Sequence, residues 1–526
     1  MNEITIAHQE IKNSVVFDYK NIRDLLSSKT KQNPNKKFLI IHGEETEKFT
    51  YLEFKNLVDK TINFLLKNNL KKNDRISIIF HNSSDFVILY FAGLCLGLTL
   101  IPINPDMSTR EIEYIIKDSK SNAVFFTNQI KNKLELTQKQ FTEKKFFNIE
   151  SIQQLISSYE TNIDFKFEDI NLNDIAEIIY TSGTTGNPKG VILSHLNLLS
   201  DSYSISKWFQ FNEKTRSLCI LPLFHNNGQI TTLLSPLYSG GSTVIVRGKT
   251  SLFAFWFLVE KYEITWTSVM SSILTVLLSY SEERKDTSLL GILCGGQILT
   301  KAVQEQFENK FGVPIFEGYG LTETTSFSCI NGYPANNRKQ GSIGKPLTTN
   351  EMMIMKEDGT STDDDLEGEI CIRGYNVAVG YLGNKEMNSV FNNGWFHSGD
   401  YGRKDKEGYF YFHGRQDSLI IKGGENVYPA EIENVLYKHP SIIECAVIGI
   451  PDKFLGENIC AFIKLNDTED IDEKEIKKFC RDKITDFKQP KKIIIINKID
   501  TLDEIPKGPT KKVLYRKLKE YYKKFY

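Results

Sequence analysis

Short runs of β-branched and aromatic residues alternate with helical patterns through the first half of the chain. The runs are KFLII (37–41), RISIIF (75–80), TLIPI (99–103), NAVFFT (122–127), AEIIYTS (176–182), STVIVR (242–247) and ITWTSV (264–269). Between them, segments such as 51–69 and 251–262 place apolar residues at helical spacing. Strands that alternate with helices favour parallel sheets with helices on both faces. The sequence therefore predicts an α/β fold, with a large N-terminal body of doubly wound sheets.

One uncharged stretch, 86–103, is as long as a membrane span. Two glycines, a threonine and a proline divide it. A continuous apolar run is also typical of a parallel strand that is covered on both faces. We therefore expect a buried helix at 85–96 that leads into a buried strand at 98–103, and no transmembrane segment.

The pattern changes near residue 350. Three runs are typical of strands joined by glycine turns: EGEICIRG (367–374), GYFYFHGR (408–415) and DSLIIKGG (417–424). The next segments alternate between helix and strand, at 430–439, 444–450, 458–465 and 472–484. We predict a small β-rich subdomain and then a small, mobile α+β C-terminal domain, with boundaries at 1–416 and 417–526.

Composition excludes several classes of function. The 65 Lys and Arg residues balance 66 Asp and Glu residues, so there is no general positive field to attract nucleic acid. The eight cysteines are scattered, with no CxxC and no clustering with histidines. This argues against a disulfide framework or a zinc site and for a reducing compartment. The first residues carry two glutamates and no apolar core of a secretory signal, so we expect a cytoplasmic protein.

The segment YTSGTTGNPKGVILSH (180–195) is suited to holding an anion. Its glycines let the backbone turn N–H groups inward, and its hydroxyl groups and lysine add donors and charge. We predict a strand, an anion-binding loop, a lysine and then a helix. The predicted contacts are Thr181, Ser182, Gly183, Thr184, Thr185, Gly186 and Lys189. Gly190 follows the lysine, so the spacing is not that of a P-loop.

This loop resembles the phosphate-loop signature of the adenylate-forming superfamily, which includes acyl-CoA synthetases, luciferases and peptide-synthetase adenylation domains. Four later blocks follow in the family's order: EGYGLTET (317–324), GWFHSGDYG (394–402), HGRQDSLIIKGGENVYPAEIE (413–433) and IPKGPTKKVLYRKL (505–518). The resemblance covers essentially the whole chain and is closest to acyl-CoA synthetases. It implies that ATP converts a carboxylic acid into an acyl-adenylate and that CoA then takes the acyl group. The implied cofactors are ATP, Mg²⁺ and CoA.

In the first step two anions approach each other, so the site has to supply cations and aligned donors. The resemblance implies that Glu323 holds Mg²⁺, while Thr322 and the loop at 181–186 contact phosphate. Its further nucleotide contacts are Gly318, Tyr319, Gly320, Asp400 and Arg415. Tyr319 would lie against the adenine, and Asp400 would accept the ribose hydroxyls. An aspartate that caps a turn is the alternative for Asp400.

The C-terminal domain supplies further implied residues. Asp417 matches the hinge about which the family's C-terminal domain rotates between the two half-reactions. Lys512 would bridge the carboxylate and the α-phosphate, although Lys511 stands where the family usually has glycine. Gly424 would line a narrow passage for the pantetheine arm, and Lys422 is a candidate contact for the CoA phosphates.

The acid itself is less well defined. PLFHNNGQ (222–229) resembles the block whose histidine or aromatic residue moves between states, and a hydrogen-bonded core histidine is the alternative. The predicted substrate pocket consists of His225, Asn226, Asn227, Met270, Ser271, Gly295, Gly296 and Gln297. The amino-acid-activating branch has an aspartate in this block, so α-amino acids are disfavoured. The amides would suit a small or partly polar acid, unless they point into backbone networks.

Three rival functions remain open. A stand-alone adenylation enzyme would load a carrier protein in place of CoA. A nucleotide-binding protein without catalysis is the second, and Lys511 is its only hint. A luciferase-like oxygenase would need the same adenylation residues.

Overall fold

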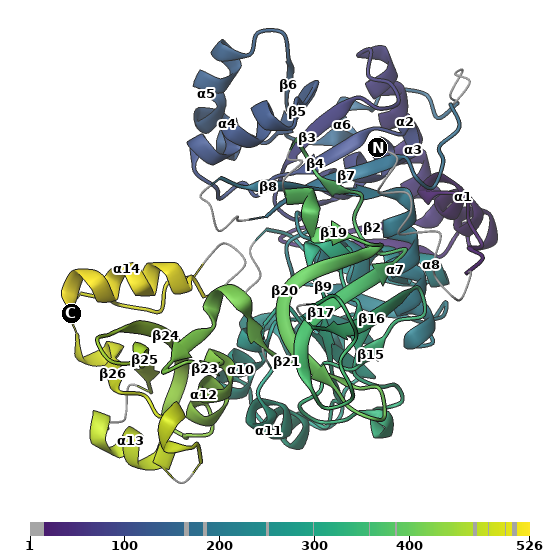
Figure 1. Cartoon of the computed structure of the whole chain (residues 1–526). Helices are drawn as coiled ribbons and strands as arrows, with labels where there is room; N and C mark the ends of the chain where they lie inside the picture. The colour runs from purple at the N-terminus through teal and green to yellow at the C-terminus, as the bar shows by residue number, and fades with distance from the viewer. Residues whose placement is uncertain are drawn as a thin grey trace.

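The computed structural model describes residues 15–162, 168–181, 187–248, 252–297, 299–356, 358–383, 387–466, 471–481, 483–499, 501–507 and 513–526. Two large mixed sheets form the N-terminal body, and a small antiparallel sheet follows them. A fourth sheet belongs to the C-terminal region, which lies to one side of the body and is coloured yellow in Figure 1. The predicted fold class is therefore confirmed.

The first sheet of the body has seven strands in the order β18-β8-β7-β4-β3-β5-β6. Their bounds are β3 Arg75–Ile79, β4 Thr99–Pro102, β5 Ala123–Phe126, β6 Lys145–Asn148, β7 Ile175–Thr181, β8 Lys189–Ser194 and β18 Gly380–Tyr381. Strands β3 to β7 are parallel, and β8 and β18 join antiparallel at one edge.

Alternate side chains of this sheet pack into two different cores. Ile78 and Phe125 pack with α2 (Tyr51–Lys67) and α3 (Ser84–Leu96), whereas Ile79 and Val124 pack with the helices on the other side. Those helices are α4 (Thr109–Asp118) and α5 (Lys131–Gln140). Because both faces are covered, the central strands are buried, which explains their continuous apolar runs.

The second sheet has nine strands in the order β15-β14-β13-β12-β11-β9-β10-β1-β2. Their bounds are β1 Lys37–His42, β2 Glu47–Thr50, β9 Arg216–Cys219, β10 Ser242–Val246, β11 Trp266–Val269, β12 Gly291–Cys294, β13 Ile315–Tyr319, β14 Cys329–Ile330 and β15 Lys345–Pro346. Only the edge strands β2, β14 and β15 pair antiparallel. The helices around it are α1 Ile22–Gln32, α7 His195–Trp208, α8 Ser235–Ser239, α9 Phe255–Lys261, α10 Ser271–Tyr280 and α11 Lys301–Phe311.

The uncharged stretch at 86–103 is a helix followed by a strand, as predicted. Helix α3 begins after Ser83, whose side chain accepts the backbone N–H of Phe86, and ends at Gly97 in a left-handed conformation (φ 80°). The chain then enters β4, whose four residues are all buried. No helix in the described ranges is long and apolar enough to cross a membrane.

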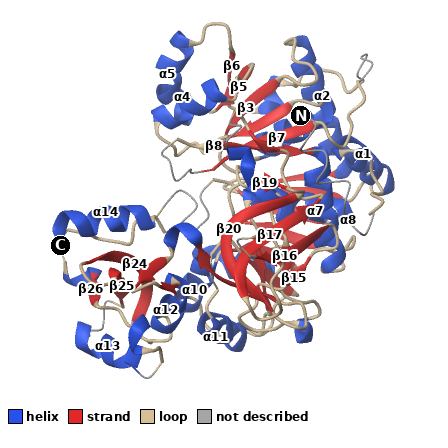
Figure 2. Cartoon of the chain, viewed as in Figure 1, coloured by secondary structure: helices blue, strands red, loops and turns tan. Residues whose placement is uncertain are grey.

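The β-rich subdomain is an antiparallel sheet of five strands. They are β16 Asn350–Met355, β17 Glu367–Gly374, β19 Phe391–Asn392, β20 Trp395–Lys404 and β21 Phe410–Arg415. β17 and β21 pair with β20 on either side. In Figure 2 this sheet lies between the body and the C-terminal region.

The C-terminal region has its own sheet and its own core. Its strands are β22 Ile420–Lys422, β23 Glu425–Val427, β24 Ile442–Asp452, β25 Gly456–Leu465 and β26 Lys492–Ile495. Helices α12 (Pro429–Leu436), α13 (Glu473–Arg481) and α14 (Tyr515–Phe525) pack on it. The predicted order of strand, helix, strand, strand and helix is present, with β23 added before the first helix and β26 and α14 after the last one. The predicted boundary at 416 and 417 falls within a short helix, η8 (Gln416–Ser418), and its exact position stays a prediction.

Candidate active site

Several of the predicted pocket and nucleotide residues meet at one edge of the nine-stranded sheet. Met270 and Ser271 follow β11, Gly295 to Gln297 follow β12, and Tyr319 ends β13. These three strands are parallel neighbours, so their carboxyl ends lie side by side. Ligands of open α/β sheets bind at this edge.

Glycines at this edge let three segments pack closely. A Cβ atom on Gly295 would lie 2.9 Å from the carbonyl oxygen of Gly318 and 2.5 Å from the ring of Phe327. One on Gly318 would lie 2.6 Å from the same ring, and one on Gly320 would collide with the Ser326 backbone. A glycine is therefore required at each position by the close approach of its neighbours, whether or not a nucleotide is bound.

Two predicted pocket segments are joined directly. The Ser271 hydroxyl donates to Oε1 of Gln297 over 3.3 Å, and the backbone N–H of Ser272 donates to the same oxygen over 3.3 Å. The side-chain amide of Gln297 therefore holds the start of α10 against the loop after β12. Its role in the described structure is to fix the relative position of these two segments.

The block that contains His225 leads into a π-helix, η3 (Asn227–Leu234), which continues directly into α8. Gly228 lies here because a Cβ atom would come within 2.8 Å of the Pro222 carbonyl oxygen. π-Helical turns are rare and often occur at functional sites. Ordinary helical periodicity does not predict one, so this element is new information from the structure.

Several polar atoms of this helix have no hydrogen-bond partner among the described residues. Among them are Oδ1 of Asn227 and Oγ1 of Thr231, and Nδ2 of Asn226, which directly precedes the helix, is in the same state. Asn226 is 5% exposed and Thr231 is 2% exposed. Buried polar atoms without partners are costly, so this set is suited to a polar ligand. Thr231 was not predicted, because a threonine inside an apolar helix gives no signal in the sequence.

The predicted ribose-binding residues form a cluster. Asp400 on β20 pairs in register with Arg415 on β21. Nε of Arg415 lies 3.0 Å from one carboxylate oxygen of Asp400, and the Tyr319 hydroxyl donates to the other over 2.7 Å. Burial and the nearby Asp400 charge raise the pKa of Tyr319 well above its usual value, so its hydroxyl stays protonated and donates. The side chain of Asp400 is 5% exposed and that of Arg415 is 53% exposed.

Glu323, the predicted Mg²⁺ ligand, lies in a short helix, η5 (Thr322–Thr324), directly after β13. Its Oε1 accepts a hydrogen bond of 2.6 Å from Tyr381. Burial, and then the Glu323 charge, raise the pKa of Tyr381, so the phenol stays protonated. Tyr381 was missed by the sequence analysis, because its position depends on the pairing of β18 with β8.

The predicted phosphate loop connects two paired strands. Thr181 at the end of β7 lies opposite Lys189 at the start of β8. Ser182, Gly183, Thr184, Thr185 and Gly186 lie outside the described residues. The expectation of a helix directly after the lysine was wrong, because β8 comes first and α7 begins only at His195. Ser194 and Asn197 form a capping box that fixes this helix start.

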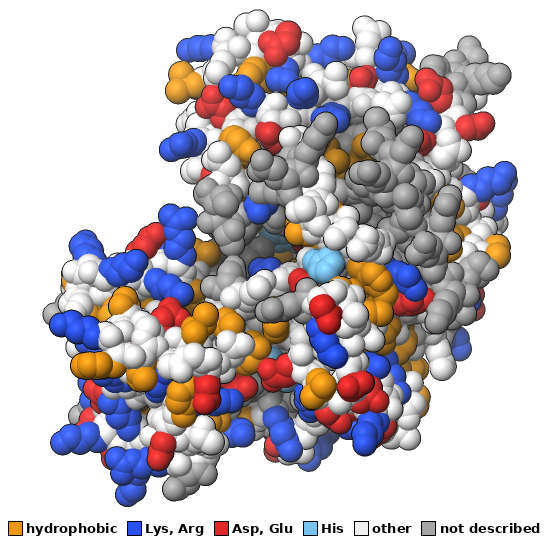
Figure 3. Space-filling view, in the orientation of Figure 1, with side chains coloured by type: hydrophobic (Ala, Val, Ile, Leu, Met, Phe, Trp, Pro, Cys, Tyr) orange, Lys and Arg blue, Asp and Glu red, His pale blue; other side chains and the backbone are white. Residues whose placement is uncertain are grey.

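The C-terminal residues are placed as follows. Gly423 and Gly424 form the turn between β22 and β23, both with positive φ (61° and 87°). The Lys422 ammonium donates to the Phe487 carbonyl over 2.6 Å, and burial lowers its pKa. Lys511 and Lys512 lie outside the described residues. Figure 3 shows a hollow between the body and the C-terminal region, with charges of both signs over the visible face.

Comparison with known proteins identifies the family. The model of the AMP-binding enzyme matches residues 26–382, and that of the AMP-binding enzyme C-terminal domain matches 431–507. The chain belongs to the AMP-binding enzyme family. The match agrees with the resemblance seen in the sequence, which is thereby confirmed.

Full-length relatives support the family match. Oxalate–CoA ligase from Arabidopsis thaliana is 31% identical over 95% of this chain and 98% of that protein. A 2-succinylbenzoate–CoA ligase from Bacillus licheniformis is 32% identical, over 91% and 96% respectively. Among solved structures, o-succinylbenzoate CoA synthetase from Bacillus subtilis, in complex with ATP and a magnesium ion, is 28% identical with a TM-score of 0.83. That match covers 94% of this chain and 99% of the solved chain.

We predict that Tyr319→Phe weakens the binding of AMP. The substitution leaves a buried carboxylate without one donor, which costs about 1.5–3 kcal/mol. We expect a lower Tm and AMP binding that is weaker by roughly tenfold or more, measured by thermal unfolding and isothermal titration calorimetry. The matched control is Tyr411→Phe, which removes a tyrosine–aspartate hydrogen bond of 3.0 Å to Asp405. Equal AMP affinities in the two variants would contradict the prediction.

Proposed function

We propose that the chain is an AMP-forming acid–CoA ligase whose acid carries a second polar group. The ligase activity agrees with the sequence prediction, and the family match and the full-length CoA ligase relatives confirm it. In the first step the acid displaces pyrophosphate from ATP and forms an acyl-adenylate. In the second step the CoA thiol takes the acyl group and AMP leaves. ATP, Mg²⁺ and CoA are the cofactors.

The cluster around Asp400 supports a role in holding the nucleotide. A carboxylate can accept both hydroxyl groups of a ribose, as acidic residues do in dinucleotide-binding folds. Tyr319 and Arg415 hold Asp400 in place, and the exposed guanidinium of Arg415 remains available to a phosphate or ribose oxygen. Tyr319 itself ends β13, directly before the turn that carries Glu323.

Glu323 is suited to Mg²⁺, because this ion prefers carboxylate oxygens and keeps several water molecules. The Tyr381 hydrogen bond occupies one carboxylate oxygen and orients the group. Residues 378–382 also tie this turn to the strand that begins with Lys189. The backbone N–H of Ala378 donates to the Glu323 carbonyl, and that of Leu382 donates to the Gly190 carbonyl, over 2.8 Å each. These contacts support a shared site for the metal ion and the phosphates.

The amides of the block at 225–227 carry the proposal about the acid. Nδ2 of Asn226 and the Thr231 hydroxyl could donate to a carboxylate or carbonyl oxygen, and Oδ1 of Asn227 could accept from a hydroxyl group. These polar atoms would be poorly suited to a long alkyl chain. Oxalate and 2-succinylbenzoate, for which two of the relatives are named, each carry a second carboxylate. A small dicarboxylic, keto or hydroxy acid is therefore the proposed class of substrate. We also propose that the reaction takes place in the cytoplasm.

A panel of acids tests this proposal. Pyrophosphate release is measured with ATP, Mg²⁺ and hydroxylamine across short alkyl, long alkyl, aromatic, hydroxylated and dicarboxylic acids. We expect the highest kcat/KM for a small acid with a second polar group, and a thioester when CoA replaces hydroxylamine. A long alkyl acid as the best substrate would contradict the proposed class. Hydroxamate without any CoA thioester would indicate a carrier protein as the acceptor.

We predict that Lys512→Ala slows adenylation on the order of 10²-fold or more, because a cation between two approaching anions is lost. Capture of a preformed acyl-adenylate by CoA should change little. The two rates are measured separately by pyrophosphate release and by thioester formation. Lys511→Ala, next to it in the chain, is the matched control and should leave both rates nearly unchanged. Equal losses in both half-reactions of Lys512→Ala would refute its role.

We predict that Gly424→Trp blocks thioester formation and spares pyrophosphate release. Within the described structure a Cβ atom at Gly424 would contact nothing within 4 Å, so the added bulk is expected to interfere where the turn faces the pantetheine arm. Gly424→Asn is the control, because asparagine tolerates positive φ and is small. Asparagine tolerates the positive φ better than tryptophan does, so the Tm of both variants is measured to separate backbone strain from bulk. A normal thioester rate in Gly424→Trp would show that this turn does not line the passage.

A further inference from the structure

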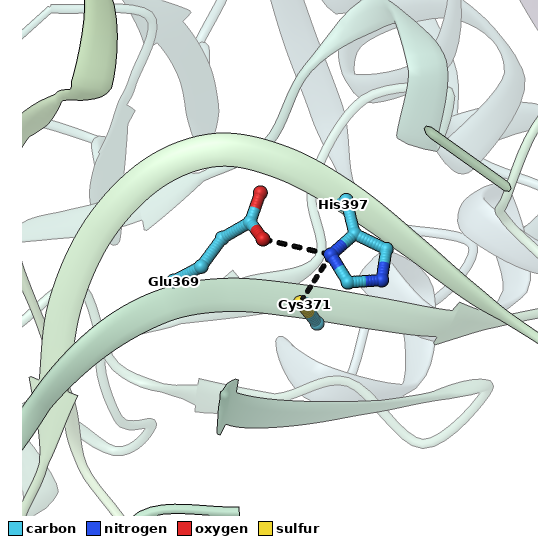
Figure 4. Close-up of side chains that lie close together, drawn as sticks. All are labelled: Glu369, Cys371 and His397. Atoms are coloured by element: carbon cyan, nitrogen blue, oxygen red, sulfur yellow. Dashed lines mark hydrogen bonds and ion pairs between the residues drawn. The ribbon is translucent and has the colours of Figure 1, made fainter. Parts of the chain in front are cut away.

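Three side chains with metal-binding atoms meet on the β-rich subdomain, outside the site described above. Nδ1 of His397 lies 2.7 Å from Oε2 of Glu369 and 3.5 Å from Sγ of Cys371. The three atoms all lie within 4.8 Å of one another. Figure 4 shows that Glu369 and Cys371 approach the same nitrogen of the imidazole ring.

Strand register brings these residues together. Cys371 on β17 lies directly opposite His397 on β20, and a bulge between Glu369 and Cys371 shifts the register beside them. The cysteine and the histidine are 26 residues apart in the chain. The scattered cysteines therefore predicted no zinc site, since the spacing of the ligands appears only when the sheet forms.

The distances suit a tetrahedral ion. Bonds of about 2.0–2.2 Å to nitrogen and oxygen and about 2.3 Å to sulfur place neighbouring ligand atoms of a zinc site roughly 3.3–3.8 Å apart. The nitrogen–sulfur distance of 3.5 Å already lies in this range, and the nitrogen–oxygen distance of 2.7 Å needs to widen by about 0.6 Å. Glu369 and His397 are 21% and 28% exposed, so a water molecule can reach the fourth position.

A thiolate, an imidazole and a carboxylate together favour a metal ion of borderline or soft character. Thiolate and imidazole ligands favour Zn²⁺ over Mg²⁺, which prefers six oxygen ligands. A further sulfur atom, Sδ of Met355, lies 3.9 Å from Sγ of Cys371. We propose that Glu369, Cys371 and His397 form a binding site for Zn²⁺, separate from the Mg²⁺ site at Glu323. Binding replaces the thiol proton of Cys371 and the proton shared by His397 and Glu369, and both protons leave to solvent.

This site is connected to the ribose-binding cluster. The other carboxylate oxygen of Glu369 accepts the backbone N–H of Gly399 over 2.9 Å. Ser398 donates to the Ile370 carbonyl over 2.6 Å and accepts the backbone N–H of Asp400 over 3.0 Å. An ion that draws Glu369 and His397 apart therefore acts on the part of β20 that carries Asp400. We expect bound Zn²⁺ to raise the KM for ATP.

Binding is tested with untagged full-length protein in excess Mg²⁺, so that the Glu323 site is saturated. Co²⁺ replaces Zn²⁺ as a spectroscopic probe, because a cobalt–thiolate bond gives a charge-transfer absorption band. We expect one Co²⁺ per chain with this band, and its displacement by Zn²⁺. In Cys371→Ser the band should be absent. In His397→Gln the Zn²⁺ affinity, measured by competition with a chromophoric chelator, should fall roughly tenfold or more.

Cys460→Ser is the matched control, because Cys460 is also a buried free cysteine but lies on β25 of the C-terminal region. It should keep both the band and the affinity. A wild-type protein without the band, or a band that persists in Cys371→Ser, would overturn the proposal. If circular dichroism shows that Cys371→Ser is unfolded, the band in the wild type and the affinity of His397→Gln decide the question.

Discussion

A buried carboxylate is stable only when hydrogen bonds or opposite charges compensate for its loss of water. The cluster proposed to bind the nucleotide depends on how Asp400 finds such partners. Asp400 is nearly inaccessible to solvent, and its two oxygens take partners from β13 and β21. The hydrogen bond from Tyr319 to Asp400 therefore joins the nine-stranded sheet of the body to the antiparallel subdomain. Glu323 is held in a similar way by Tyr381, which comes from the edge of the seven-stranded sheet. Two tyrosine–carboxylate contacts thus align three sheets around one site.

Parallel strand order places residues proposed for the acid next to a residue proposed for the nucleotide. β11, β12 and β13 end at one edge, and each contributes a loop there. The close glycine contacts of Gly295, Gly318 and Gly320 bring these loops against Phe327. The π-helix η3 adds buried side-chain polar atoms that have no hydrogen-bond partner among the described residues. The proposed class of substrate rests on these polar atoms beside His225.

The sequence was informative where one segment determines its own structure. Runs such as 75–80 and 99–103 became buried strands, because a strand that is covered on both faces has to be apolar along its whole length. The cluster of Tyr319, Asp400 and Arg415 followed from three separate motifs, and the structure brings these residues together.

The remaining features depend on pairing between distant segments. Tyr381 reaches Glu323 only because β18 joins β8, and the strand at 189–194 was mistaken for the start of a helix. Cys371 and His397 meet through sheet register. The π-helical hydrogen bonding of η3 cannot be predicted from the spacing of apolar residues in the sequence. A single sequence can therefore indicate which residues belong to such a site, but it cannot show which residues from distant segments contact them.

The C-terminal region encloses its apolar side chains by itself. Among the described residues, its two buried clusters contain only residues from Ile420 onward, and the clusters of the body contain none of these. A rotation of this region about Asp417 would therefore leave these clusters intact, but it would separate Tyr428, which is 3% exposed, from the ring of His413 on β21, 5.8 Å away. The free-energy difference between two orientations would then come from the contacts at the boundary, such as that of Tyr428 with His413, and not from the main cores. Bound ligands would need to supply only a small differential affinity to change the preferred orientation at each step of the cycle.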